Sequence, residues 1–309
     1  MAEPATLTML GKALGQHPAW VRHHVKLLES AGLVEMYSAQ ITGGYVEKYY
    51  RAKASAFWLQ GMILPETRGA SYRVLLGSDD LALSDLAQRA AERLGLRLIL
   101  QPVGSLDGLI ALRQGMAQIS ACHLLDAASG EYNLPYVRHI FPDREVRLIT
   151  LAHRAQGLLV AEGNPLRIRG IADLAREDVT LVNRNPGSGT RLWLDQQLAR
   201  LGISPEQVRG YSEEVCTHRE IAQAIRQGRA DAGLGLLAAA SQMKLASPAT
   251  RLDFVPLFQE RFDLVLKAGE MQTPPVAELL EYLNSAEGRT LIASLDGYDI
   301  THSGEMLTP

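Results

Sequence analysis

Two kinds of apolar spacing alternate along residues 71–309. Residues 72–76 and 96–100 are short runs rich in Leu, Ile and Val, which is typical of buried strands. Between them, residues 83–94 carry apolar side chains at intervals of three and four, which predicts a helix with one buried face. Strands that alternate with helices favour a mostly parallel sheet. We therefore predict that this part of the chain is an α/β domain.

The first 60 residues show a different pattern. A short helix is predicted over 7–14 and a longer one over 18–31, because proline fits the first position of a helix. Two strands are predicted over 33–37 and 46–51, joined by a hairpin with Gly-Gly at its tip. The order of helix, turn, helix and hairpin predicts a winged helix–turn–helix. The buried stripe of the longer helix is predicted to consist of Val21, Val25 and Leu28.

The segment LGQHPAWVRHHVKLLESAGLVE, followed by GGYVEKYYRAKASAF, resembles the winged helix of the ArsR-like bacterial regulators. The resemblance implies that the second helix enters the major groove of DNA and that the hairpin lies over the backbone. The helices that usually precede this motif are missing or very short, so the mode of dimerisation stays open. The alternative is a small packing domain with a solvated basic face. The residues that the resemblance places on DNA are His17, Trp20, Arg22, His23, Lys26, Lys48 and Arg51.

The strongest chemical signal is the stretch NRNPGSGTRLWL at residues 183–194. A β-branched run over 178–182 predicts a strand before it, and leucines at helical spacing predict a helix after it. Glycines let the backbone approach a ligand, and the first turn of a helix offers unpaired N–H groups. The spacing matches neither a P-loop, nor the dinucleotide fingerprint, nor a nucleophile elbow. The predicted anion cradle comprises Arg184, Gly187, Ser188, Gly189, Thr190 and Arg191.

Two further serines, Ser78 and Ser105, stand where a predicted strand turns into a predicted helix. Ligands of open α/β sheets bind at the carboxyl ends of strands, so these serines are expected to share a site with the cradle. Thr217 and His218 are further candidates from the second half of the domain. The alternative for each serine, and for the Gly-Ser-Gly-Thr turn, is helix capping. Three nearby carboxylates suit a bare anion poorly, and either point away or indicate a ligand that carries donors: Asp79, Asp80 and Asp107.

Five segments in order resemble the type 2 periplasmic-binding-protein-like ligand domain found in cytoplasmic regulators and fused to molybdenum-cofactor proteins. They are GSLDGLIALRQGMAQISACHLLD, RAQGLLVAEGNPL, VNRNPGSGTRLWLD, THREIAQAIRQGRADAGLG and ERFDLVL. The resemblance implies two lobes joined by crossover strands, with a ligand in the cleft. Similar domains hold molybdate, tungstate or phosphate with serine hydroxyls and helix N-termini. In the phosphate-binding relatives an arginine stands four residues before the serine, as Arg184 stands before Ser188.

The predicted organisation is therefore an N-terminal winged helix–turn–helix followed by a two-lobed type 2 periplasmic-binding-protein-like domain. The predicted bounds are 1–60 for the DNA-binding domain, 61–70 for a linker, 71–309 for the sensing domain, about 71–152 and 267–309 for lobe 1, and about 153–266 for lobe 2.

These features predict a one-component transcriptional regulator that binds a double-stranded DNA operator and senses a small oxyanion, with molybdate or tungstate favoured. A small organic anion is the alternative, because Arg184, Arg191 and Tyr132 suit it equally well. An enzyme acting in the same cleft is a weaker alternative, since no nucleophile–base pair or carboxylate dyad stands out. A homodimer or higher homo-oligomer is expected because operators are usually two-fold.

Composition changes this picture little. The net charge of −3 over 309 residues gives no overall nucleic-acid signal, so a DNA-binding surface has to be local. Cys122 and Cys216 lack metal-ligand spacing and are expected to be reduced and buried in a cytoplasmic protein. His23 and His24 are adjacent and point in different directions, so no metal site is predicted, and no cofactor either. No apolar run is long enough to span a membrane.

Overall fold

The computed structural model describes residues 3–42, 44–54, 71–246 and 251–309. The chain forms two compact units, Met1–Gly61 and Met62–Pro309. The linker predicted over 61–70 lies outside the described residues. Within the described part of the chain, no helix has the length and apolar character needed to cross a membrane.

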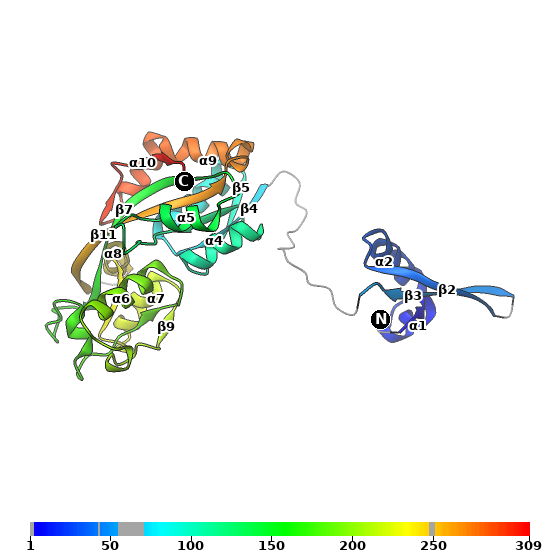
Figure 1. Cartoon of the computed structure of the whole chain (residues 1–309), viewed down its shortest axis with the longest axis horizontal. Coiled ribbons are helices and arrows are strands. Elements are labelled where there is room, and N and C mark those ends of the chain that lie inside the picture. Colours follow the sequence, from blue (N-terminus) through cyan, green and yellow to red (C-terminus); the bar gives the residue numbers. More distant parts are fainter. Residues whose placement is uncertain (1–2, 43, 55–70, 247–250) are drawn as a thin grey trace. The chain divides into compact units, whose positions relative to one another are not determined.

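The first unit consists of two helices and a three-stranded antiparallel sheet (Figure 1). Helix α1 (Leu7–Leu14) begins after Thr6, whose hydroxyl accepts a hydrogen bond from the Met9 N–H at 3.2 Å. Helix α2 (Pro18–Ser30) begins at the proline, as predicted. The strands are β1 (Ala5–Thr6), β2 (Val34–Thr42) and β3 (Tyr45–Ala52), and they pair in the order β1-β3-β2.

The core of the first unit is small. Val21, Val25 and Val34 are its buried residues, with at most 5% of each exposed. Leu28 is 39% exposed, so the prediction that it faces inward is wrong. The apolar cluster covers only the first two turns of α2, and the partly buried residues that complete this cluster are Leu7, Leu10 and Tyr50.

The second unit is a two-lobed α/β structure built on a mixed sheet. Its strands are β4 (Ser71–Gly77), β5 (Leu96–Pro102), β6 (Ile119–Cys122), β7 (Val146–Ala161), β8 (Asn183–Arg184), β9 (Glu214–Val215), β10 (Ala232–Leu236), β11 (Leu252–Lys267), β12 (Tyr298–Asp299) and β13 (Met306–Leu307). The sheet has the order β10-β7-β11-β6-β4-β5, with β12 and β13 also paired to β7. β4 is parallel to β5 and β6, whereas every pair that β7 or β11 forms in this sheet is antiparallel, so the prediction of a mostly parallel sheet is wrong. The short strands β8 and β9 form a separate parallel pair.

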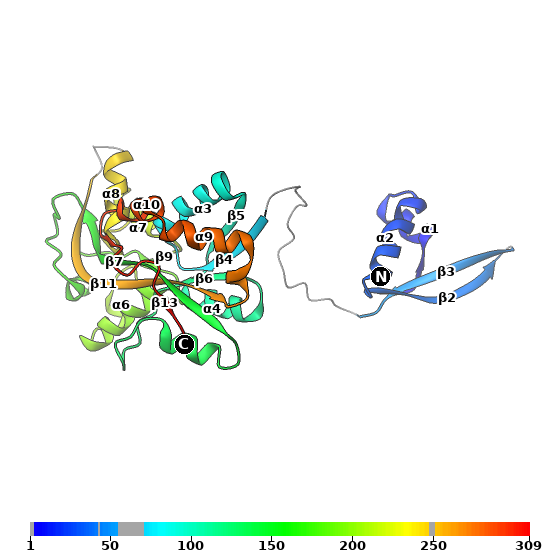
Figure 2. The same cartoon turned by 90° about the horizontal axis from the view of Figure 1, so that it is seen from above.

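Helices cover both faces of this sheet. Their bounds are α3 Leu81–Leu94, α4 Ser105–Gln114, α5 Leu134–Ile140, α6 Gly189–Arg200, α7 His218–Arg226, α8 Leu237–Ala246, α9 Pro274–Asn284 and α10 Ala286–Ala293. Short 3₁₀ turns lie at Ile171–Ala175, Pro205–Gln207 and Glu270–Gln272. Figure 2 shows α3, α9 and α10 on one side of the sheet and α4 on the other. The helical spacing of residues 83–94 is confirmed, since α3 buries Leu83, Leu86 and Ala90 against the sheet.

Two long strands, β7 and β11, connect the lobes (Figure 1). Each spans 16 residues, and they pair with each other over nearly their whole length. Both strands continue through polar positions of the sequence, among them Arg154, Gln156 and Glu260. Polar residues interrupt the apolar pattern there because the strands carry buried charged groups where they cross between the lobes. On the two sides of this charged segment, β7 contributes to different apolar clusters: Leu148 packs in one and Leu158 in the other.

Leu109 and Ile110 test the orientation of α4. Leu109 is 0% exposed, whereas its neighbour Ile110 is 39% exposed. Leu109→Ala is expected to lower the free energy of unfolding by about 2–5 kcal/mol, because it removes buried methyl groups and leaves a cavity. Ile110→Ala is expected to change it by only about 0.5 kcal/mol. Chemical denaturation measures both variants, and equal losses would contradict the position of α4.

Candidate ligand-binding cleft

Residues 183–191 form a turn from a short strand into a helix. The strand is β8 at 183–184 rather than the predicted 178–182, where Leu181 makes an isolated bridge to Ala232. Ser188 caps α6, and its hydroxyl accepts a hydrogen bond from the Arg191 N–H at 3.2 Å. Gly187 has a φ of 80°, a left-handed conformation that favours glycine. The other first-turn N–H groups of α6, those of Gly189 and Thr190, have no partner within the helix.

Apart from the contacts of the crossing strands β7 and β11, three hydrogen bonds join loop segments of the two lobes at the seam between them. They join Leu106 N to Gly187 O (3.1 Å), Asn185 Nδ2 to Val103 O (3.1 Å) and His218 N to Asp79 Oδ2 (2.9 Å). Two of these bonds start or end in the turn that begins α6, and the third lies at the start of α7. The lobes are therefore closed on each other around the ends of β4, β5 and β6.

Gly189 gives the seam its tightest contact. A Cβ atom built on Gly189 would overlap the carbonyl oxygen of His123 and lie 2.7 Å from its Nδ1. Gly104 on the neighbouring turn has a similar role, because its Cβ would lie 3.0 Å from the carbonyl carbon of Gly187. The absence of side chains at these glycines allows the backbone of one lobe to touch the other.

Four of the predicted hydroxyls are buried at this seam. Ser78, Ser105, Ser188 and Thr190 are 3%, 0%, 0% and 1% exposed. Ser188 is a helix cap, as the alternative interpretation predicted. Ser78 and Ser105 are not, since Asp80 caps α3 and Gly104 is the N-cap of α4. The Ser105 hydroxyl instead accepts a hydrogen bond from the backbone N–H that follows β6, at 3.3 Å.

Arg184 is a buried cation without a counter-charge. It is 1% exposed, its Nη1 lies 3.0 Å from His218 Nε2, and its Nη2 donates to the Cys216 carbonyl at 2.8 Å. Its Nε has no hydrogen-bond partner. Among the described residues, no carboxylate oxygen lies within 4.0 Å of the guanidinium. Burial lowers the pKa of Arg184 from its ordinary value, opposed mainly by Asp79. An unpaired buried charge is costly, so this arginine indicates an anionic partner.

Arg154, in contrast, has two carboxylate partners, although its Nε, like that of Arg184, has no hydrogen-bond partner. It lies on β7 opposite Glu260 of β11 and Tyr298 of β12. It donates to Asp80 at 2.6 Å and also pairs with Glu260, while the Tyr298 hydroxyl donates to Asp80 at 2.5 Å. Burial opposes the ionisation of Arg154, but the two carboxylates outweigh it and raise its pKa. The charge of Asp80 is therefore neutralised by Arg154 within the protein and is not available to a ligand.

His123 bridges Ser78 and Glu260. Its Nε2 lies 2.8 Å from Ser78 Oγ, and its Nδ1 lies 2.6 Å from Glu260 Oε2. Burial would raise the pKa of Glu260, but Arg154 and His123 outweigh it and lower the pKa to about 2. Glu260 is therefore ionised at neutral pH and only accepts hydrogen bonds. Burial lowers the pKa of His123, so its ring is neutral with the proton on Nδ1, and Ser78 donates its hydroxyl proton to Nε2.

Two predicted ligand-binding residues are engaged within their own lobe. Arg191 forms ion pairs with Asp195 at 3.0 Å and Glu214 at 2.8 Å. Thr217 caps α7, and its hydroxyl donates to Glu220 at 2.9 Å and accepts from the Glu220 N–H at 3.1 Å. Neither side chain has the free charge or free donor that the sequence prediction gave it.

His218 and Cys216 flank the buried guanidinium of Arg184. His218 is 0% exposed, and burial followed by Arg184 holds its pKa well below the usual value, so the ring is neutral. Both cysteines are free, but only Cys122 is buried. The prediction that Cys216 is buried is wrong: its carbonyl oxygen faces Arg184 while the residue as a whole is exposed.

Several residues of this network were not predicted: His123, Arg154, Gln156 and Glu260. His123 directly follows β6, so the rule that drew attention to Ser78 at the end of β4 applies to it as well. Arg154 and Glu260 interrupt apolar strands, and a charge in such a strand is buried only when it is paired. Gln156 links the crossing strands to α6, since its amide donates to Thr190 at 3.2 Å and to Glu260 at 2.9 Å. In the described ranges, no group of three or more His, Cys, Asp or Glu side chains has the arrangement of a metal site.

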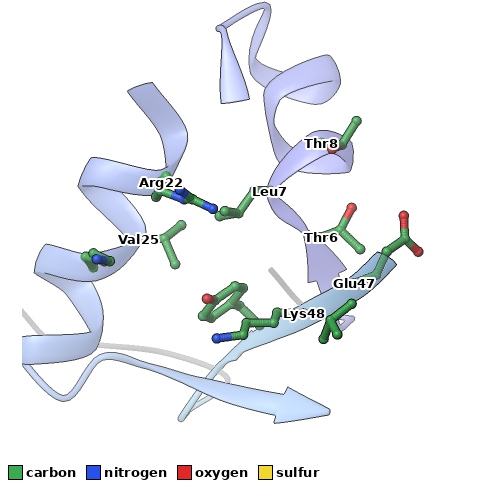
Figure 3. Close-up of a pocket in the computed structure, with 10 residues that line it drawn as sticks. Thr6, Leu7, Thr8, Arg22, Val25, Glu47 and Lys48 are labelled. Carbon is green, nitrogen blue, oxygen red and sulfur yellow. The ribbon is translucent and has the colours of Figure 1, made fainter. Parts of the chain in front are cut away.

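In the first unit, three predicted DNA-facing cations line one groove of about 440 Å³ (Figure 3). They are Arg22 and Lys26 from α2 and Lys48 from β3, and Glu47 lies at the same groove. Figure 3 shows Arg22 and Lys48 on facing elements, with Thr6 and Thr8 at the start of α1 beside them.

The other predicted DNA-facing residues differ in their availability. Trp20 is 48% exposed and its ring lies 3.9 Å from that of His24, and His23 is exposed beside it. His17 caps α2, because its Nδ1 accepts a hydrogen bond from the Ala19 N–H at 3.2 Å. Arg51 pairs with Glu35 at 2.8 Å.

Comparison with known proteins identifies the second unit. A family model described as the PBP superfamily domain matches residues 86–284. The chain is 35% identical over 235 residues to the uncharacterized protein YvgK of Bacillus subtilis (strain 168), which covers 76% of this chain and 73% of that protein. It is 33% identical over 115 residues to an uncharacterized protein in the 5′ region of a ferredoxin 2Fe-2S gene of Clostridium pasteurianum, covering 37% of this chain and 96% of the relative.

A similar fold occurs among solved structures. A protein from Clostridium perfringens, described as a phosphate ABC transporter substrate-binding protein with bound phosphate, superposes with a TM-score of 0.52 at 14% identity. The match covers 75% of this chain and 100% of that chain.

Gly189→Ala tests the closed seam. The added methyl group has no room beside His123, so the lobes are expected to separate. The amide hydrogens of Leu106 and His218 are bonded across the seam, and their exchange with solvent is expected to become about tenfold faster or more. Hydrogen exchange read by NMR measures this. Gly170→Ala is the matched control, because nothing lies within 4 Å of its added Cβ. Unchanged exchange in Gly189→Ala would show that the seam tolerates a side chain there.

Proposed function

The chain belongs to the PBP superfamily, and on that premise we propose that it is a one-component transcriptional regulator. The two-lobed α/β fold of this superfamily binds ligands and is typically not an enzyme fold. In the proposal, residues 71–309 close on a small oxyanion, and residues 1–60 bind double-stranded DNA in the cytoplasm. The bound anion favours the closed lobes and so changes the spacing of the paired DNA-binding units of a homodimer.

The observation that carries the sensing role is the unpaired charge of Arg184. The other arginine of the cleft, Arg154, has two carboxylate partners, and Arg191 also has two. Only Arg184 among these three is buried without an ion pair. The start of α6 and the buried hydroxyls of Ser105 and Ser188 lie at the same seam and supply further donors for an anion.

The sequence resemblance names molybdate or tungstate as the oxyanion. Both meet the need of Arg184 for a negative charge. A small organic anion, such as an amino acid, a carboxylate or a phosphorylated metabolite, meets it equally well. The charge of Arg184 supports the class of ligand and does not distinguish its members.

The DNA-binding role rests on the first unit. Its two helices and hairpin have the order of a winged helix–turn–helix, and α2 is the candidate recognition helix. Arg22, Lys26 and Lys48 gather at one groove, where they provide the local positive surface that a protein of net charge −3 needs for DNA. His17 and Arg51 are occupied within the unit and support the fold rather than the contact.

One arrangement favours a second candidate function, catalysis. Ser78, His123 and Glu260 are linked by contacts of 2.8 Å and 2.6 Å, the order of a nucleophile, a base and an orienting carboxylate. The sequence patterns do not reveal this series, because its members are far apart along the chain. An enzyme consumes its ligand, whereas a sensor returns it unchanged, so turnover separates the two functions.

Arg184→Gln tests the sensing role. In wild-type protein, one of molybdate, tungstate, sulfate, phosphate or an amino acid is expected to raise the unfolding temperature, since a ligand at 100 times its Kd stabilises the fold by about 2.7 kcal/mol. In Arg184→Gln the shift is expected to disappear, because removing one partner of a buried charge pair costs about 2–5 kcal/mol of binding.

Arg176→Gln is the control for this experiment, because Arg176 pairs with Asp178 at the surface. Thermal unfolding and calorimetric titration measure both variants. A shift retained in Arg184→Gln contradicts the proposal, and depletion of the ligand during titration indicates an enzyme.

Replacing Arg22, Lys26 and Lys48 together by Ala tests the DNA-binding role. Binding to a mixed-sequence duplex is expected to weaken, and the slope of log affinity against log salt is expected to fall by about one for each phosphate that is no longer neutralised. Lys12→Ala on α1, outside the groove, is the control. Fluorescence anisotropy at several salt concentrations measures the affinity of both variants for the duplex. An unchanged slope in the triple variant would show that DNA does not bind at this groove.

A further inference from the structure

A groove on the second unit, outside the cleft, gathers three arginines. Its volume is about 340 Å³, and its cationic residues are Arg138, Arg144 and Arg147. Arg138 lies in the last turn of α5, Arg144 in the loop that follows this helix, and Arg147 at the start of β7. None of the cleft residues described above lines this groove. Its other lining residues are Phe141, Pro142, Glu145, Val146, Thr308 and Pro309.

The charges of these arginines are not neutralised within the described part of the chain. None of the three guanidinium groups has a carboxylate oxygen within 4.0 Å among the described residues. Asp143, which precedes Arg144, pairs instead with Arg113 at 2.6 Å. Glu145 lines the groove but is exposed and forms no ion pair with another described residue. Since arginine keeps its proton at every physiological pH, the described lining carries three positive charges and one negative charge.

Two of the guanidinium groups are held in place by backbone carbonyls. Arg144 Nη1 donates to the carbonyl oxygen of Arg113, and Arg147 Nη1 donates to that of Val146 at 2.9 Å. A carbonyl oxygen carries no net charge, so these bonds orient the side chains and leave their charges unneutralised. A guanidinium has several N–H donors in a planar fork, which matches the geometry of a phosphate group. The groove therefore offers oriented donors to an anion.

The number of charges and the walls of the groove narrow the class of anion. Three positive charges at one groove repel one another, and an anion with several negative charges relieves this repulsion best. Among the described lining residues, the one aromatic side chain is that of Phe141, which is 4% exposed. It offers almost no surface on which a nucleobase could stack. Recognition at this groove therefore depends on phosphate groups and not on an aromatic base.

We propose that this groove is a second ligand site of the protein and that it binds an anion with two or more linked phosphate groups. The phosphates bridge the guanidinium groups of Arg138, Arg144 and Arg147. Inorganic diphosphate and the phosphate end of a nucleoside diphosphate share this chemistry. A single tetrahedral anion such as phosphate or sulfate spans fewer of the arginines and binds more weakly. The site is independent of the sensing role proposed for the cleft.

Inorganic diphosphate is the first probe, with phosphate and sulfate as the single-anion comparisons. Calorimetric titration of the full chain at neutral pH is expected to show diphosphate binding about tenfold tighter or more, because it pairs with more guanidinium groups. The same titration of Arg184→Gln separates the two sites, since that arginine belongs to the cleft and not to the groove. Diphosphate binding is expected to be retained in this variant.

ADP distinguishes the two sources of linked phosphates. An affinity for ADP equal to that for diphosphate shows that the phosphates alone are recognised. A tighter affinity for ADP identifies a nucleotide as the ligand. Both results support a site for linked phosphates.

Arg138→Gln tests the location of the site. The side chain of Arg138 has no hydrogen-bond or ion-pair partner among the described residues, so its replacement is not expected to disturb the fold. Diphosphate binding is expected to weaken about tenfold, because one charged contact is lost. Arg200→Gln is the matched control, since Arg200 is an exposed arginine in the last turn of α6, outside the groove. It is expected to leave the affinity unchanged.

Glu145→Gln is expected to act in the opposite direction. It removes the negative charge from the described lining of the groove, so diphosphate is expected to bind about twofold tighter or more. Damage to the fold would not increase affinity, and this variant therefore separates an electrostatic effect from a structural one. Calorimetric titration at low salt measures it, because the effect of an exposed charge is screened at high salt.

The outcomes separate the groove from the cleft. If phosphate or sulfate binds wild-type protein as tightly as diphosphate, the requirement for linked phosphates is overturned. If diphosphate binding is lost in Arg184→Gln and unchanged in Arg138→Gln, the anion occupies the cleft, and the groove proposal is overturned while anion sensing stands. If neither diphosphate nor ADP binds wild-type protein, the groove is not a site for linked phosphates.

Discussion

The second unit depends on the buried charge of Arg154. Its guanidinium stands where two long strands pass from one lobe to the other, and it is held by Glu260 on β11 and by Asp80 at the start of α3. The ring of Phe262 lies 3.9 Å away and covers its face. An ion group this deep is stable only when every partner is in place, and loss of one partner leaves an uncompensated charge. The crossing point is therefore defined by charge pairing rather than by apolar packing alone.

This pairing decides what the cleft can do. Because Arg154 uses Asp80 and Glu260, neither carboxylate repels an anion, and Glu260 is free to fix the proton of His123. Arg184 forms no ion pair with a carboxylate within 4.0 Å among the described residues. Two buried arginines of one cleft thus differ in their ion pairing, because the fold brings two carboxylates to Arg154 and none within 4.0 Å of Arg184 among the described residues.

Patterns in the sequence predicted the two-lobed α/β domain and part of the candidate site. Alternating apolar runs predicted the α/β domain. The Pro-Gly-Ser-Gly turn predicted the start of α6, because a helix cap depends on residues that are adjacent in the sequence. These patterns could not assign Arg191, since nothing local shows that Asp195 and Glu214 neutralise it. They also missed the series from Glu260 to Ser78, whose members are separated by 137 and 45 positions. Contacts of that range depend on strand register, which a single sequence does not reveal. The predicted burial of Leu28 was wrong for a different reason. Its helical spacing was correct, but the apolar cluster beside α2 does not extend to it.

The pairing of β7 also has a consequence for the order of folding. Its neighbours β10, β11, β12 and β13 all follow it in the chain, and the Ser303 hydroxyl bonds the Leu151 carbonyl across 152 positions. During synthesis, β7 emerges long before the strands that pair with it. Until then Arg154 has no ion pair with Glu260, and the backbone N–H and C=O groups at the edges of β7 are unpaired. The first unit, in contrast, has partners that are close in sequence and forms early. A nascent chain therefore holds its small N-terminal unit before it has a ligand cleft, and the period in between is when it most needs protection from aggregation.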